Sequence, residues 1–138
     1  MQYKLIQKGV SAKSWIVEFE FKVTHDGGLS GDGFGFWYTK EIGQEGTVFG
    51  NKNNFDGLGI FFDTYANSRT RKTFPYIMAM VGDGNTPYDH DFDGKKTEKG
   101  GCAAEFRNKE YATKARVKYV HNSYLQVITS NLLFCLQD

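Results

Sequence analysis

The chain has 138 residues, enough for one domain with a hydrophobic core and too few for two. Its 17 Lys and Arg residues nearly balance its 16 Asp and Glu residues, and the net charge of +1 indicates no nucleic-acid partner. No apolar run approaches the roughly 20 residues that span a bilayer, and the N-terminal residues lack the apolar centre of a signal peptide. We therefore expect this chain not to insert directly into a membrane.

Strands are the predicted elements, because aromatic residues make up 16% of the chain and 16 Gly residues suit the turns between strands. Apolar and polar residues alternate in the first segment, which predicts a half-buried antiparallel strand. The apolar face of that segment carries Trp15, Val17, Phe19, Phe21 and Val23. Residues 34–39, 58–65 and 76–81 are short apolar runs, and they predict strands that are buried on both faces.

The last third of the chain predicts a hairpin, with strands at residues 115–120 and 124–129 joined by three residues. Residues 104–115 lack a sustained helical stripe and are expected to form a loop or a short turn. The sum is an all-β antiparallel sandwich of two packed sheets. Because the sequence begins shortly before its first predicted strand and stops just after its last, we expect a sandwich that is incomplete at both ends.

The acidic stretch YDHDFDG partly matches a calcium-binding EF-hand loop. Asp89, Asp91, Asp93 and Gly94 match the first, third, fifth and sixth positions of that loop. The twelfth position requires a bidentate Glu, and this chain has Gly100 there. No helices are predicted on either side of the stretch, which disfavours the EF-hand interpretation.

Zinc and hydrolase sites are also disfavoured. His25, His90 and His121 are far apart in the sequence, and no Gly-x-Ser-x-Gly motif is present. Glu18 and Glu20 have the residue type of a glycosidase pair, but they alternate with apolar residues and therefore indicate a solvated strand face. An enzyme is accordingly the weakest of the alternatives.

A second group of oxygen donors follows the apolar run at residues 58–62. Asp63, the backbone carbonyl of Tyr65 and the amide of Asn67 are hard donors of the kind that Ca²⁺ prefers. Joined in space to Asp93, they would supply ligands from two loops. The alternative is that Asp63 and Asn67 only shape a turn, and the residue types alone leave both interpretations open.

The order of several motifs resembles the L-type (leguminous-type) lectin domain of cargo receptors of the early secretory pathway. These receptors are the intermediate-compartment and vesicular integral membrane lectins. The resemblance runs from about Trp15 to Ile128 and rests on GDGFGFWYTKE, GTVFGNKNNFDGLGIFFDTYAN, FPYIMAMVGDGN, YDHDFDGKKTEKGGCAAEFRN and KARVKYVHNSYLQV. It implies a concanavalin-like β-sandwich of the jelly-roll type, with residues 1–138 as a partial carbohydrate-recognition domain.

The resemblance also implies a function and a set of site residues. The implied function is non-catalytic, calcium-dependent binding of high-mannose N-linked glycans on glycoprotein cargo, in the lumen of the ER, the ER–Golgi intermediate compartment and the Golgi. The implied metal ligands are Asp63, the Tyr65 carbonyl, Asn67 and Asp93, and the implied sugar-binding residues are Asp32, Asn67 and His90. The peptide bond before Asp32 is typically cis in this family.

Some features of the family are not matched. Its domain continues past the last residue of this chain, with further strands and a glycine-rich loop that completes the sugar site. Cys102 matches the first cysteine of a family disulfide, and Cys135 lies near the place of the second. The resemblance allows a homo-oligomer. The alternative function is a β-sandwich fragment that binds no glycan and associates through strand edges, or that does not fold stably alone.

Overall fold

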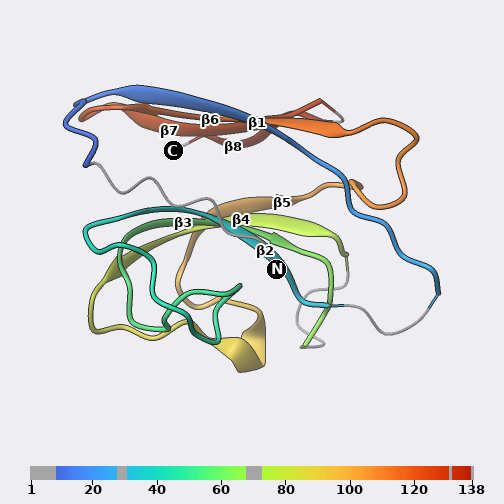
Figure 1. Ribbon diagram of the computed structural model, residues 1–138, viewed down its shortest axis with the longest axis horizontal. Helices are drawn as coiled ribbons and strands as arrows, with labels where there is room; N and C mark the ends of the chain where they lie inside the picture. Colours follow the sequence, from blue (N-terminus) through green and yellow to red (C-terminus); the bar gives the residue numbers. More distant parts are fainter. Residues whose placement is uncertain (1–8, 28–30, 68–72, 131, 138) are drawn as a thin grey trace.

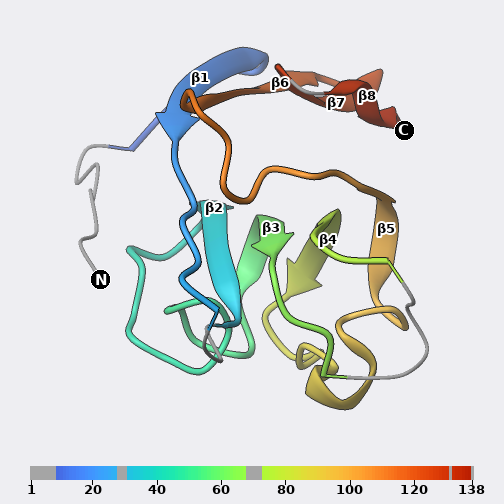
Figure 2. The ribbon, with the colours of Figure 1, turned by 90° about the vertical axis from the view of Figure 1, so that its right-hand side faces the viewer.

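The computed structural model describes residues 9–27, 31–67, 73–130 and 132–137. Within these residues two antiparallel sheets of four strands face each other, with strand orders β1-β6-β7-β8 and β2-β3-β4-β5 (Figure 1). The strands are β1 (Trp15–Phe21), β2 (Gly33–Thr39), β3 (Asp56–Asp63), β4 (Tyr76–Asp83), β5 (Glu98–Ala103), β6 (Thr113–Val120), β7 (Tyr124–Thr129) and β8 (Leu132–Gln137). Figure 2 shows β2 to β5 side by side in one layer, with the other sheet across the top. The predicted all-β sandwich is confirmed.

The helical content of the described residues is one 3-10 turn, η1 (His90–Phe92). None of their helices has the length and apolar character needed to span a membrane. The loop predicted at residues 104–115 holds for residues 104–112, whereas residues 113–115 belong to β6, which pairs with β7 as the predicted hairpin.

Two strands were missed, and two predictions of burial were wrong in part. Neither β5 nor β8 has an alternating sequence, and each is defined by hydrogen bonding to its neighbour, β4 or β7. The prediction of burial on both faces holds for residues 58–63, but the predicted strand is two residues too long, and Tyr65 beyond it is 39% exposed. Tyr38 near the end of β2 is 37% exposed and Val81 on β4 is 55% exposed.

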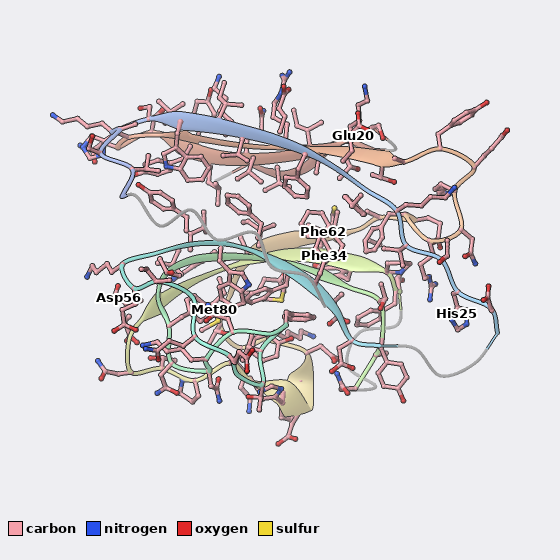
Figure 3. All side chains as sticks on the ribbon, in the orientation of Figure 1. Glu20, His25, Phe34, Asp56, Phe62 and Met80 are labelled. Carbon is pink, nitrogen blue, oxygen red and sulfur yellow. The ribbon has the colours of Figure 1, made fainter. Side chains whose placement is uncertain are left out.

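The core between the sheets is built around Phe62 of β3, which is fully buried. Its ring stacks on Phe34 of the neighbouring strand β2, with ring centroids 4.6 Å apart. From the opposite sheet, Phe19 and Phe21 meet Phe62 edge-on at centroid distances of 5.9 and 5.1 Å. Figure 3 shows Phe34 and Phe62 between the layers. The alternation predicted for β1 therefore places Phe19 and Phe21 against β3, while Trp15 packs against Phe36 and Tyr38 of β2.

A second core lies on the other face of the β2-β3-β4-β5 sheet. The connections at residues 40–55 and 84–97 run along this face, away from the first sheet (Figure 1). Their buried side chains pack against Phe61 of β3 and Met78 and Met80 of β4. The residues that the connections contribute are Val48, Phe55 and Tyr88. Both faces of β3 are thus buried, which explains its nearly continuous apolar sequence.

Charged side chains pair on the outer face of β1 and β6, as the alternation in β1 predicts. Arg116 places Nε and Nη2 each 2.6 Å from Oε1 of Glu18, and Lys114 Nζ lies 3.4 Å from Oε1 of Glu20. Such exposed ion pairs contribute at most about 1 kcal/mol each. Glu18 and Glu20 therefore form the predicted solvated face.

Replacing Phe62 by Ala should lower the free energy of unfolding by about 3–5 kcal/mol, because the ring is fully buried between four other aromatic rings. Urea unfolding followed by tryptophan fluorescence measures the change. Tyr111→Ala is the control, since Tyr111 is 77% exposed and should change stability by less than about 0.5 kcal/mol. Equal effects of the two substitutions would contradict the assignment of the core.

The pairing of Cys102 with Cys135 stays a prediction, which the topology supports. Cys102 lies on β5, Cys135 lies on β8, and these two strands contact each other across the sandwich. If the two residues pair, alkylation of the denatured, unreduced chain should modify neither cysteine, and reduction should cost about 4 kcal/mol of stability. Two modified thiols in the unreduced monomer would contradict the pairing.

Candidate functional site

The end of β3 lies beside the start of β2, and this pairing brings Asp32 to the residues that follow β3. Gly33 is the register partner of Asp63. A Cβ atom at Gly33 would lie 2.1 Å from the carbonyl oxygen of Phe62, so only glycine allows this approach. The carbonyl of Asp32 accepts hydrogen bonds from the N–H of Thr64 at 2.7 Å and from its hydroxyl at 3.1 Å. The Gly31–Asp32 peptide is cis, as predicted.

Asp63 is a buried carboxylate at the last position of β3, where it is 2% exposed. Because side chains alternate along the strand, it lies on the same face as Phe61, next to the second core. Its Oδ1 accepts a hydrogen bond from the N–H of Tyr65 at 3.0 Å, which turns the chain around the carboxylate. Tyr65 is itself 39% exposed, and Asn67 is exposed.

Asp93 is the second buried carboxylate, at 1% exposure, and it follows η1 in a left-handed conformation with φ of 52°. The next residue, Gly94, packs tightly on the second core. A Cβ atom there would lie 2.5 Å from the Tyr88 ring and 2.9 Å from Met78. Oδ1 of Asp93 accepts a hydrogen bond at 2.8 Å from the N–H of Asn67. This contact joins the segment after β3 to the YDHDFDG stretch.

His90 and Asp32 are both exposed, but they lie on different segments of the chain. The His90 ring stands edge-on to Tyr88 at a centroid distance of 5.0 Å, and Tyr88 is held by a 2.7 Å hydrogen bond from its N–H to Oδ1 of Asn53. The contacts described for His90 do not connect it to Asp32 or Asn67. Hydrogen bonds from backbone N–H groups thus join five of the predicted residues, and His90 lies on the neighbouring turn. The five are Asp32, Asp63, Tyr65, Asn67 and Asp93.

The EF-hand alternative does not fit this geometry. The stretch forms a short 3-10 turn, and the described residues on either side of it form no α-helix. Asp89 lies 3.5 Å from Lys96 Nζ, while Asp91 is exposed. Asp93 is thus the buried carboxylate of this stretch that faces the segment after β3.

The joined residues offer a donor set suited to a hard divalent cation. Two carboxylates, an amide and a backbone carbonyl supply oxygen atoms, as calcium sites do. Buried carboxylates are normally paired with a cation or a strong donor. In the part of the chain that the structure describes, no group of three or more His, Cys, Asp or Glu residues is arranged to hold a metal. A cation at this site would therefore depend on the Asn67 amide and the Tyr65 carbonyl as well as on the two carboxylates.

Two residues of the site have no counterpart in the sequence predictions. Thr64 connects Asp32 to the end of β3, and Arg107 donates from Nη1 to the carbonyl of Thr64 at 3.4 Å. Both contacts involve backbone carbonyls of residues distant in the sequence. A side-chain pattern carries no signal of such a partner.

Comparison with known proteins gives the family. Residues 5–137 match the legume-like lectin family. The VIP36-like protein of Mus musculus is 47% identical over 112 residues, which are 78% of this chain and 32% of that protein. Protein ERGIC-53 of Homo sapiens is 38% identical over 119 residues, which are 86% of this chain and 23% of that protein.

A solved structure agrees with these matches. The VIP36 exoplasmic/lumenal domain in its Ca²⁺- and mannose-bound form superposes with a TM-score of 0.91 at 39% identity, covering 97% of this chain and 58% of that one. The chain spans about a third or less of the length of the curated relatives named above. The predicted resemblance and the β-sandwich are both confirmed, and the chain belongs to the legume-like lectin family.

Proposed function

We propose that this chain is the calcium-binding, mannose-recognising part of a non-catalytic lectin. The observation that carries the proposal is the hydrogen bond from the Asn67 N–H to the buried Asp93 carboxylate, which joins two oxygen-rich segments beside Asp63. Solved forms of the related VIP36 domain contain Ca²⁺ with mannose or with Man3GlcNAc, which supports the same ligands here. Lectin binding of this kind requires no bond-breaking step and no catalytic residue.

Calcium at this site would be held by Asp63, the Tyr65 carbonyl, Asn67 and Asp93. The ion would supply positive charge between two carboxylates that are both almost fully buried. It would also fix the direction of the Asn67 amide, which lies on an exposed part of the chain. The protein contributes the frame, because Gly94 anchors Asp93 to the second core and the β2-β3 pairing anchors Asp63.

The sugar would be bound by Asp32, Asn67 and His90. A carboxylate accepts hydrogen bonds from two hydroxyl groups, an amide both donates and accepts, and an imidazole adds one more bond. Asp32 is suited to this role because its backbone carbonyl is occupied by Thr64 while its side chain lies at the exposed surface. Asn67 takes part in both sets, so the ion and the sugar should bind in a coupled way.

The proposed setting is the lumen of the early secretory pathway, with high-mannose N-glycans of glycoprotein cargo as partners. The relatives are named as a vesicular integral-membrane protein and as ERGIC-53, and the matched VIP36 domain is lumenal. A single shallow site would bind one glycan weakly. Several sites acting together would then supply useful affinity, which a homo-oligomer would provide.

Asp63→Asn and Asp93→Asn should each weaken calcium binding by more than about 100-fold, beyond the 10–100-fold loss typical of a residue that only supports a ligand. Both substitutions keep an oxygen that can accept the Tyr65 or Asn67 N–H, so the turn should survive. Calorimetric titration measures the affinity.

In the parent chain, calcium at a hundredfold excess over its dissociation constant should add about 2.7 kcal/mol to the unfolding free energy.

Asp91→Asn is the matched control, because Asp91 is an exposed carboxylate in the same turn and belongs to neither residue set. It should leave calcium and mannose binding unchanged. A parent chain that melts cooperatively but shows no calcium-dependent shift would contradict the metal site. An associating chain without glycan binding would favour the alternative, strand-edge association.

Asp32→Asn should weaken the binding of mannose without changing the binding of calcium. The loss of a charged acceptor should weaken mannose binding by about tenfold or more, since hydrogen bonds to charged groups contribute about 1.5–3 kcal/mol. Calcium affinity should stay at the parent value, because Asp32 reaches the metal residues only through its backbone carbonyl. Glycan-array or calorimetric binding to mannose, measured at saturating calcium, tests this order. Loss of calcium binding in Asp32→Asn would contradict the assignment.

A further inference from the structure

Arg107 connects the two chain segments that leave the site end of the β2-β3-β4-β5 sheet. It lies in the connection between β5 and β6. Its Nη1 donates to the carbonyl of Thr64 at 3.4 Å, and its Nη2 donates to the carbonyl of Phe74 at 3.2 Å. Thr64 directly follows β3, and Phe74 lies two residues before Tyr76, the first residue of β4. One guanidinium thus holds the backbone just after β3 to the backbone just before β4.

The backbone of Arg107 is held by the segment after β1, and its guanidinium lies beside Glu105. The Arg107 backbone forms a parallel bridge with Val23, and its N–H donates to Oε1 of Glu105 at 3.2 Å. The same carboxylate oxygen lies 3.6 Å from Nε of Arg107. The next residue, Asn108, donates its N–H to the carbonyl of Val23 at 2.8 Å. Arg107 is therefore fixed to the segment that follows β1, and only 32% of its side chain is exposed.

The contact between Arg107 and Thr64 involves the peptide group that lies between two proposed calcium ligands, Asp63 and the Tyr65 carbonyl. The Thr64–Tyr65 peptide offers its carbonyl to Arg107 and its N–H to Oδ1 of Asp63. The plane of this peptide is consequently fixed at both ends. It sets the direction of the chain into Tyr65, whose own carbonyl is a proposed ligand. The N–H of Thr64 is bonded to Asp32, so the same residue also links the sugar side of the site.

We propose that Arg107 is a positioning residue, which sets residues 63–67 in the geometry that binds calcium without contacting the ion or the sugar. The proposal rests on the calcium site proposed above. Arginine suits the role because its rigid fork reaches two separate carbonyls at once, which the single ammonium of lysine does not match. The positive charge beside a cation site would by itself oppose calcium. The adjacent Glu105 carboxylate offsets that charge.

Arg107→Gln and Arg107→Lys test the proposal, since the first removes the charge and the second keeps it while removing the fork. Calorimetric titration should show calcium binding weakened by about tenfold in both variants, which is a change of 1.4 kcal/mol. At saturating calcium, mannose affinity should return to within about twofold of the parent, or about 0.4 kcal/mol, because the bound ion then holds residues 63–67 in place. A residue that only stabilised the fold would not combine weaker calcium binding with mannose affinity that is restored at saturating calcium.

Arg116→Gln is the matched control, because Arg116 is a guanidinium that pairs with Glu18 on the outer face of β6. Its calcium affinity should equal that of the parent. Equal or tighter calcium binding in both Arg107 variants would overturn the proposal. Loss of a cooperative melt in chelator for both variants would also overturn it, because Arg107 would then serve the fold. If the parent chain binds no calcium, the proposed function fails instead.

Discussion

The burial of β3 on both faces is the constraint on which the rest of the structure depends. One set of its side chains, centred on Phe62, packs against the aromatic residues of β1 in the opposite sheet. The other set, centred on Phe61, packs under the connections at residues 40–55 and 84–97. A strand in this position tolerates few polar residues. Asp63, its last residue, is the point at which the apolar strand meets the oxygen donors.

The second core determines the geometry of the site, because residues 84–97 pack on it and lie next to the end of β3. Tyr88 and Gly94 lie against Phe61 and Met78, and this packing leaves Asp93 beside the Asn67 N–H. Asp93 is therefore positioned by packed structure. The hydrogen bonds of the Thr64–Tyr65 peptide to Arg107 and Asp63 continue the same arrangement on the other side.

The sequence predicts the parts of the fold that are encoded locally. The alternation from Trp15 to Phe21 identifies β1 and its inner face, and the apolar run before Asp63 identifies β3 and the origin of the site. The strand β5, with sequence EKGGCA, has no such pattern, because its conformation is imposed by hydrogen bonding to β4. The sequence also does not predict the partners of Thr64, because the Asp32 carbonyl and the Arg107 side chain come from distant segments.

The separation of the site residues along the chain has a kinetic consequence. Asp32, Asp63 and Asp93 are brought together only after β2 pairs with β3 and the segment at residues 84–97 packs on that sheet. In a denatured chain Asp63 and Asp93 are 30 residues apart and are not held together, so an ion that needs both carboxylates binds only after these segments have met. Such an ion would stabilise the native state and not the denatured chain. Its presence would lengthen the lifetime of the folded protein and leave its rate of formation nearly unchanged.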